Sequence, residues 1–185
     1  MLARTPSPRI DIPPADSQIA AYADPGDYMD CFAIALADRP DLQTCDPRRL
    51  AEHCGTIDFA WSRGLLWLRD TLVKPLGLKA TPDLSSDQIH KPVEEKTVGD
   101  RVNFFRIFAI EEHEVLLGED DLHQDFRLSV LRTCGPEAKL VLTTVCKRHN
   151  WFGHVYLASI LPVHKKLVKA TLETAIEKPL PKPAG

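Results

Sequence analysis

The chain of 185 residues lacks most of the motifs that would assign a function directly. Its five cysteines are never spaced as C-x-x-C, so neither a zinc ribbon nor a disulfide framework fits, and free thiols in a reducing compartment are expected. No G-x-G-x-x-G or Walker sequence is present, so the sequence offers no dinucleotide or P-loop site. A G-x-S-x-G elbow and a cysteine-protease signature are missing too, which leaves the common nucleophilic enzymes without a motif.

The chain also has neither a dominant charge nor a long apolar run. A formal net charge of -3 and scattered basic residues give no footprint for nucleic acid or for an anionic membrane surface. No stretch approaches the roughly 18 consecutive apolar residues of a membrane span. Prolines near the start interrupt the apolar run that a secretory signal needs. We therefore expect a cytoplasmic protein that neither binds nucleic acid nor inserts stably into a membrane.

The first half of the chain predicts a strand and two helices. Residues 1–27 contain five prolines, which predicts an extended arm with a short edge strand at 9–12. Residues 28–36 alternate large apolar with small side chains, as in a strand packed closely on one face. Asp46, Pro47 and Gly55 suit the N-cap, first position and stop of a short helix. Apolar spacing predicts a second helix from 57 to 74, and proline and glycine punctuation predicts a loop over 77–100.

The second half predicts an antiparallel meander followed by one long helix. Segments 102–110, 113–119, 122–133 and 139–149 read as strands joined by short connections. From about Asn150 to Ile176, two neighbouring apolar stripes suit a helix that lies across a sheet. Pro162 in its middle costs about 3 kcal/mol in a regular helix, and we expect it to kink the helix over a curved sheet. Residues 28–177 are then a single domain, followed by a disordered tail over 178–185.

This order of elements resembles the helix-grip fold of the START-like and polyketide-cyclase-like (SRPBCC) superfamily. In that α+β fold an antiparallel sheet wraps a long C-terminal helix and leaves a cavity between them. From Trp61 onward the amino-acid sequence also resembles an uncharacterised bacterial family of domains of unknown function. Some members of that family are fused to short-chain-dehydrogenase-like domains. The shared pattern comprises Gly118 to Asp121, His123, Asp125 to Arg127, His149, Asn150, Gly153, Pro162 and His164. The chain departs from it at Gln124, where the family has an apolar residue, and at "PVHK", where it has Pro-Phe-His-Arg. The resemblance implies a fold and no reaction.

Polar side chains alternate along the predicted strand from His123 to Ser129 and should share one face. If that face lines a cavity, His123 could shuttle a proton, Asp125 could orient it, and Arg127 could hold a carboxylate. These three are the catalytic candidates. The alternative is a solvated face with an ion pair of about 0–1 kcal/mol.

The leading hypothesis is a domain that binds a small hydrophobic or amphipathic molecule between sheet and helix. The candidate ligand-binding residues are Trp61, Phe105, His123, Arg127, Tyr156 and His164. No metal or cofactor is expected, because His149, His154 and His164 lack the spacing of metal ligands. Two alternatives stay open: a cyclase or hydrolase that uses the His-Asp-Arg row, and an interaction or regulatory module that partners an oxidoreductase. The sequence does not decide between a monomer and a homodimer.

Overall fold

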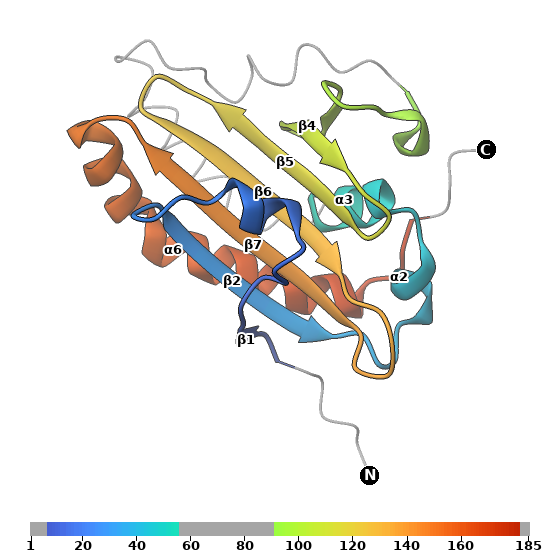
Figure 1. Cartoon of the computed structure of the whole chain (residues 1–185). Coiled ribbons are helices and arrows are strands. Elements are labelled where there is room, and N and C mark those ends of the chain that lie inside the picture. The colour runs from blue at the N-terminus through green and yellow to red at the C-terminus, as the bar shows by residue number, and fades with distance from the viewer. Residues whose placement is uncertain (1–6, 56–90, 182–185) are drawn as a thin grey trace.

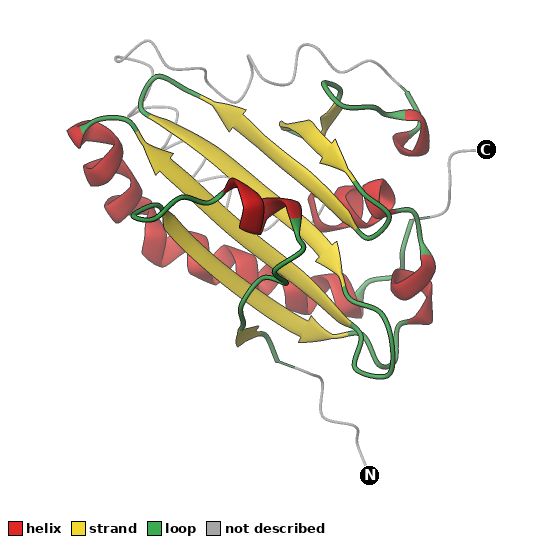
Figure 2. Ribbon diagram, in the orientation of Figure 1, coloured by secondary structure: helices red, strands yellow, loops and turns green. Residues whose placement is uncertain are grey.

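The computed structural model describes residues 7–55 and 91–181, and these build one antiparallel sheet with helices on both faces (Figures 1 and 2). The seven strands lie in the order β1-β2-β7-β6-β5-β4-β3. They are β1 (Arg9–Ile10), β2 (Tyr28–Ala35), β3 (Arg101–Val102), β4 (Phe105–Ile110), β5 (Glu114–Asp120), β6 (Gln124–Arg132) and β7 (Lys139–Arg148). The helices are α1 (Gln18–Tyr22), α2 (Pro40–Thr44), α3 (Pro47–Gly55), the short 3-10 turn η2 (Val93–Glu95) and α6 (Trp151–Glu177). The predicted α+β class, with an antiparallel sheet and a long C-terminal helix, is confirmed.

The meander predicted for the second half is present as β4 to β7, each strand paired with the next. β2 then pairs with β7, which places the first long strand beside the last one. The alternation predicted for residues 28–36 sorts the two faces of β2. Phe32 and Ile34 enter the main core, whereas Cys31 and Ala33 belong to a smaller cluster on the other face. The alternation in the sequence therefore predicts correctly which side chains of β2 face the main core.

The long helix α6 lies behind the sheet in Figure 1, along β2 and β7, with α3 beside its C-terminal end. Asn150 caps it, with Oδ1 accepting a hydrogen bond from the backbone N of Gly153 at 2.9 Å. Its sheet-facing side buries Leu157, Val168, Leu172 and Ala175. We refer to this side of the sheet as the helix face. The arrangement is consistent with a helix-grip fold.

Pro162 interrupts neither the helix nor its packing. The helix is continuous from Trp151 to Glu177, so a pair of helices separated by a loop is ruled out. Pro162 and Ala158 are both exposed, so water can reach the carbonyl group that the proline leaves without its usual donor. The kink expected from the sequence stays a prediction.

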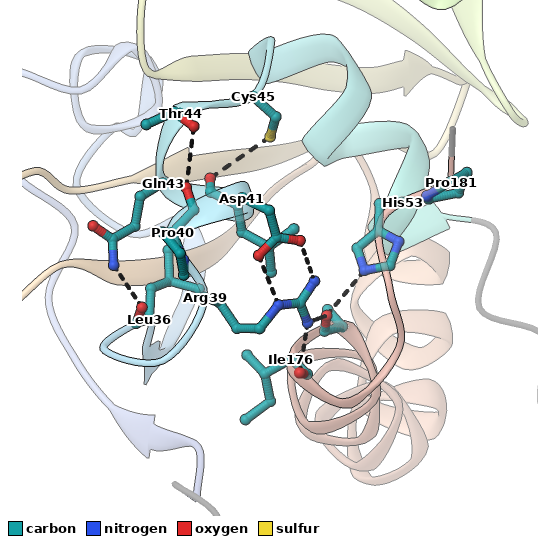
Figure 3. Close-up of polar contacts among 12 residues, drawn as sticks. Leu36, Arg39, Pro40, Asp41, Gln43, Thr44, Cys45, His53, Ile176 and Pro181 are labelled. Carbon is teal, nitrogen blue, oxygen red and sulfur yellow. Dashed lines mark hydrogen bonds and ion pairs between the residues drawn. The ribbon is translucent and has the colours of Figure 1, made fainter. Parts of the chain in front are cut away.

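The C-terminal end of α6 is closed by polar contacts from α2 and α3 (Figure 3). Arg39 donates from Nη1 to the carbonyl oxygens of Ala175 and Ile176, at 3.0 and 2.5 Å. The same guanidinium forms two hydrogen bonds with Asp41, at 2.9 and 2.7 Å. His53 is buried, and its Nε2 lies 2.9 Å from the carbonyl oxygen of Ala175. A cation and a donor at the negative end of the helix dipole make this end a structural anchor.

The other face of the sheet carries α1, the short blue helix in front of the strands in Figure 1. Ile19 is fully buried there against Leu116 and Val145. Ser17 caps the helix, and the backbone N of Gln18 donates to Oε2 of Glu114 at 2.8 Å. The sequence predicted an extended arm over residues 1–27, and within it only the edge strand β1 was anticipated. The helix was missed because its stability comes from these tertiary contacts and not from a periodic apolar pattern.

Several predictions fall partly or wholly outside the described residues. The helix predicted for 57–74, the residue Trp61 and most of the loop predicted for 77–100 lie there. The described end of that loop contains η2. At the predicted tail, Leu180 packs against the main core and Arg49 donates to the carbonyl oxygen of Pro181. None of the helices in the described ranges combines the length and the apolar character needed to span a bilayer.

Candidate functional site

Four residues of the shared sequence pattern, His123, His149, Asn150 and Gly153, meet where the β5–β6 turn touches the start of α6. The backbone N of His149 donates to the carbonyl oxygen of His123 at 2.9 Å. A Cβ on Gly153 would lie 2.4 Å from that same oxygen, so only glycine allows the helix to start this close to the turn. Nδ2 of Asn150 lies 3.1 Å from Nδ1 of His123, whose ring packs edge-on against Phe152 at 4.7 Å. These four residues of the pattern therefore form a junction between sheet and helix.

Asp125, Arg127 and Ser129 alternate along β6 and share the face of the sheet that α1 covers. Asp125 pairs with His149 on that face, Oδ1 to Nε2 at 3.0 Å. His123 precedes β6, and its ring contacts Asn150 and Phe152 at the start of α6. The hypothesis of a cyclase or hydrolase that uses these residues stays a prediction.

Arg127 is buried in a structural setting. Its guanidinium carbon lies 3.5 Å from the ring centroid of Phe108 and 4.9 Å from that of Tyr22, which ends α1. Nη1 pairs with Oδ1 of Asp120 at 2.6 Å. Two residues further on, Ser129 donates to Oε1 of Glu114 at 2.6 Å. Every polar group named here has a partner, so this row fastens α1 to the sheet.

The helix face has a different character at the end of the sheet near the start of α6. On antiparallel strands, residues directly opposite one another point to the same side. Tyr28 lies opposite Cys146, and Cys146 opposite Phe126. One row further into the sheet, Asp30 lies opposite Thr144. Two rows of mixed polar and aromatic side chains thus continue the apolar rows of Phe32 and Ile34.

Asp30 is the centre of this region. Its side chain is 9% exposed, and Oδ2 accepts a hydrogen bond from the hydroxyl of Tyr28 at 2.6 Å. Nε2 of His164, on α6, lies 3.4 Å from the same oxygen. Burial by itself raises the pKa of Asp30, but the neighbouring His164 and Tyr28, together with the charge of Lys165, outweigh it and hold the pKa below its usual value. The carboxyl group is therefore ionised at neutral pH.

Two buried polar atoms of the row that contains Asp30 have no hydrogen-bond partner within the described ranges, Oδ1 of Asp30 and Oγ1 of Thr144. Oε1 of Gln124 and Nε2 of His123, further along the sheet, are also buried without a partner. Thr144 as a whole is 1% exposed. Buried polar groups in folded proteins nearly always have partners, and each one without costs about 1–3 kcal/mol. We name Tyr28, Asp30, Thr144 and His164 the interlayer cluster.

Aromatic side chains flank the interlayer cluster. Phe126 packs against Phe105 with ring centroids 5.5 Å apart. On α6, Phe152 and Tyr156 stack at 6.2 Å. These two share a helical stripe with Ile160 and His164, because residues four apart lie on the same side of a helix. All four members of the stripe are half-buried.

Two ionisable groups beside Asp30 on the sheet, Cys146 and Tyr28, are held neutral. Burial raises the pKa of the Cys146 thiol to about 12, and the charge of Asp30 adds to the effect. The pKa of Tyr28 is also raised, first by burial and then by its hydrogen bond to Asp30. In the same row, Arg101 neutralises Glu119 in an ion pair of 2.8 Å between Nη1 and Oε2. Asp30 thus presents a carboxylate beside neutral Tyr28 and Cys146, while His164 and the positive charge of Lys165 act on it from α6.

An antiparallel sheet carrying one long C-terminal helix, with a polar and aromatic cluster between the two layers, defines the class of this domain. The chain matches the model of the family described as "Protein of unknown function (DUF2867)" over residues 22–171, and it belongs to that family. The resemblance to a domain of unknown function is thereby confirmed, and the match begins earlier in the chain than Trp61, at the end of α1. No curated protein and no solved structure matches the chain.

Of the six predicted ligand-binding residues, His164 belongs to the interlayer cluster and Tyr156 shares its helical stripe. Phe105 packs against Phe126, and His123 contacts Asn150 and Phe152 at the start of α6. Arg127 lies on the other face of the sheet, and Trp61 is outside the described residues. Sequence reasoning missed Tyr28, Asp30 and Thr144. One signal was available: Asp30 falls on the large-residue face of the alternating segment 28–36, where an acidic side chain needs an explanation.

Proposed function

We propose that this protein binds a small amphipathic molecule between the helix face of the sheet and the first half of α6. The observation that carries the proposal is the set of buried polar atoms in the interlayer cluster that lack partners. A ligand with a polar end would supply those partners, and its apolar end would meet the aromatic rings beside them.

The two ends of α6 support this location. At the C-terminal end, Arg39 and His53 satisfy the last carbonyl groups of the helix, and large apolar side chains fill the space between helix and sheet. Further toward the N-terminus of α6, where His164 contacts Asp30, the buried atoms Oδ1 of Asp30 and Oγ1 of Thr144 have no partner within the described ranges. A protein that used this region for stability alone would gain from apolar residues there. The helix-grip resemblance adds support, since such folds hold ligands in the same place.

A displacement assay with the apolar dye N-phenyl-1-naphthylamine tests the proposal. Saturable binding of the dye to the full chain, with displacement by medium-chain amphiphiles, is the expected result, and native mass spectrometry should show one ligand per chain. Phe126→Ala should weaken binding, because that ring lies in the cluster region on the helix face. Phe108→Ala is the matched control, since that ring lies beneath Arg127 on the other face.

Two results would contradict the proposal. One is a dye signal that never saturates, which indicates nonspecific contact with exposed apolar side chains. The other is an equal loss of affinity in Phe126→Ala and Phe108→Ala, which would reflect general destabilisation and not a site. Circular dichroism melting of both variants shows whether their losses of stability are comparable.

A further inference from the structure

The interlayer cluster also limits the chemistry of the polar end of the ligand, an inference that rests on the proposed function. Oδ1 of Asp30 is buried and has no partner within the described ranges. An ionised carboxylate oxygen is an acceptor only. Whatever completes it must therefore donate a hydrogen bond.

We propose that the ligand carries a hydrogen-bond-donating head, an ammonium or a hydroxyl group, and not an anionic one. Asp30 is the acceptor at the centre, with Oδ2 already held by Tyr28 and Oδ1 facing no donor of the described chain. Thr144 lies directly opposite Asp30 in the sheet, and its hydroxyl can accept from the same head or donate to it.

The charges around the cluster agree with this assignment. His164 contacts Oδ2 of Asp30 from α6, and Lys165, next to it, is exposed. On the sheet side, Arg101 and Glu119 neutralise each other. The group left to meet the ligand is the carboxylate of Asp30. A carboxylate or phosphate head would be placed against that charge, with which His164 and the positive charge of Lys165 already interact.

Three ten-carbon probes with apolar chains of nearly equal length separate the alternatives. Decylamine, decanol and decanoate differ mainly in the head group, and their affinities for the full chain can be measured by isothermal titration calorimetry at pH 7.5. The amine and the alcohol should bind about tenfold or more tightly than decanoate, because a charge-assisted hydrogen bond is replaced by repulsion. The ranking of decylamine against decanol then tells which donor the site prefers.

The matched variants are Asp30→Asn and Asp125→Asn. Asp30→Asn should lower the affinity for decylamine about tenfold, and it should reduce the difference in affinity between decylamine and decanoate. Asp125→Asn should change neither, because that carboxylate pairs with His149 outside the cluster. Thr144→Val is a second variant in case Asp30→Asn does not fold, and it should lower the affinity for decanol by a few fold.

Each outcome bears on a distinct claim. Decanoate binding as tightly as decylamine, or an unchanged preference in Asp30→Asn, would overturn the assignment of the head group while leaving the proposed function in place. If none of the three probes binds, the proposed function fails and this inference fails with it.

Discussion

Nε2 of His164 lies 3.4 Å from Oδ2 of Asp30, and this contact ties the C-terminal helix to the second strand of the sheet. It joins a residue of the shared sequence pattern to one that the pattern does not include. The proline two positions before His164 leaves the helix unbroken, so the histidine stays in register with Phe152 and Tyr156. The contact places an ionised group between the layers, where an apolar pair would be more stable.

Thr144 provides a test of whether the cluster sacrifices stability for binding. Its buried hydroxyl has no partner within the described residues, so Thr144→Val should raise the free energy of unfolding by about 1 kcal/mol. Urea denaturation followed by circular dichroism measures the change. The neighbouring Thr143→Val is the control: that hydroxyl faces the other side and donates to Sγ of Cys31 at 3.2 Å, so its loss should destabilise. Destabilisation by both variants to a similar extent would mean that Thr144 is a structural residue.

Arg127 should matter for folding and not for the ligand. Arg127→Leu removes the contacts with Phe108 and Tyr22 and the ion pair with Asp120, so we expect a loss of about 2 kcal/mol of stability. Dye affinity at a temperature where the variant is folded should match that of the unchanged protein. If Arg127→Leu kept normal stability but bound the dye more weakly, this prediction would be wrong. Arg127 would then be a ligand-binding residue, as the sequence predicted.

The sequence predicted the fold further than it predicted the site, and particular residues explain why. The alternation along residues 28–36 and the apolar stripes of the last helix show which side chains are buried. Burial of apolar surface is the largest favourable contribution to the free energy of folding. The face on which Arg127 lies depends on the register of β6 against β5 and β7, and no local pattern reveals that α1 will cover it. The cluster combines Tyr28 and Asp30 with Thr144 from a strand far along the chain, a pairing that only the sheet order creates.

His53 should make stability depend on pH. Burial lowers the pKa of His53, and this effect outweighs that of the Ala175 carbonyl, so the folded state keeps the imidazole neutral. Below the unfolded-state pKa of about 6.5 the unfolded chain takes up a proton that the folded chain resists, and stability therefore falls as the pH falls. Melting temperatures between pH 8 and pH 5 should drop less in His53→Gln than in the unchanged protein. His154→Gln, at an exposed position, should keep the full dependence, and equal slopes in all three proteins would contradict the assignment.

The thiols should differ sharply in their reactivity. All five cysteines lie in the described ranges: Cys134 is exposed, Cys45 is half-buried, and Cys31, Cys54 and Cys146 are buried. Iodoacetamide under native conditions should modify Cys134 first, on the order of a hundredfold faster than Cys54 or Cys146, because buried thiols react only through opening of the fold. Burial also raises the pKa of Cys54 to about 12, which keeps its thiol protonated. Peptide mapping by mass spectrometry gives the rates, and fast modification of Cys146 would show that the cluster region opens readily.

The most direct test of the central claim is to locate the bound probe by nuclear magnetic resonance. Titration of decylamine into isotope-labelled protein should shift, in a saturable manner, the signals of Tyr28, Asp30, Phe126, Thr144 and His164, which belong to the interlayer cluster and its aromatic border. The signals of Cys31, Ala33, Leu131 and Val141, which cluster on the opposite face, should stay in place. Shifts confined to that opposite face, or shifts that never saturate, would contradict a ligand site between the sheet and α6.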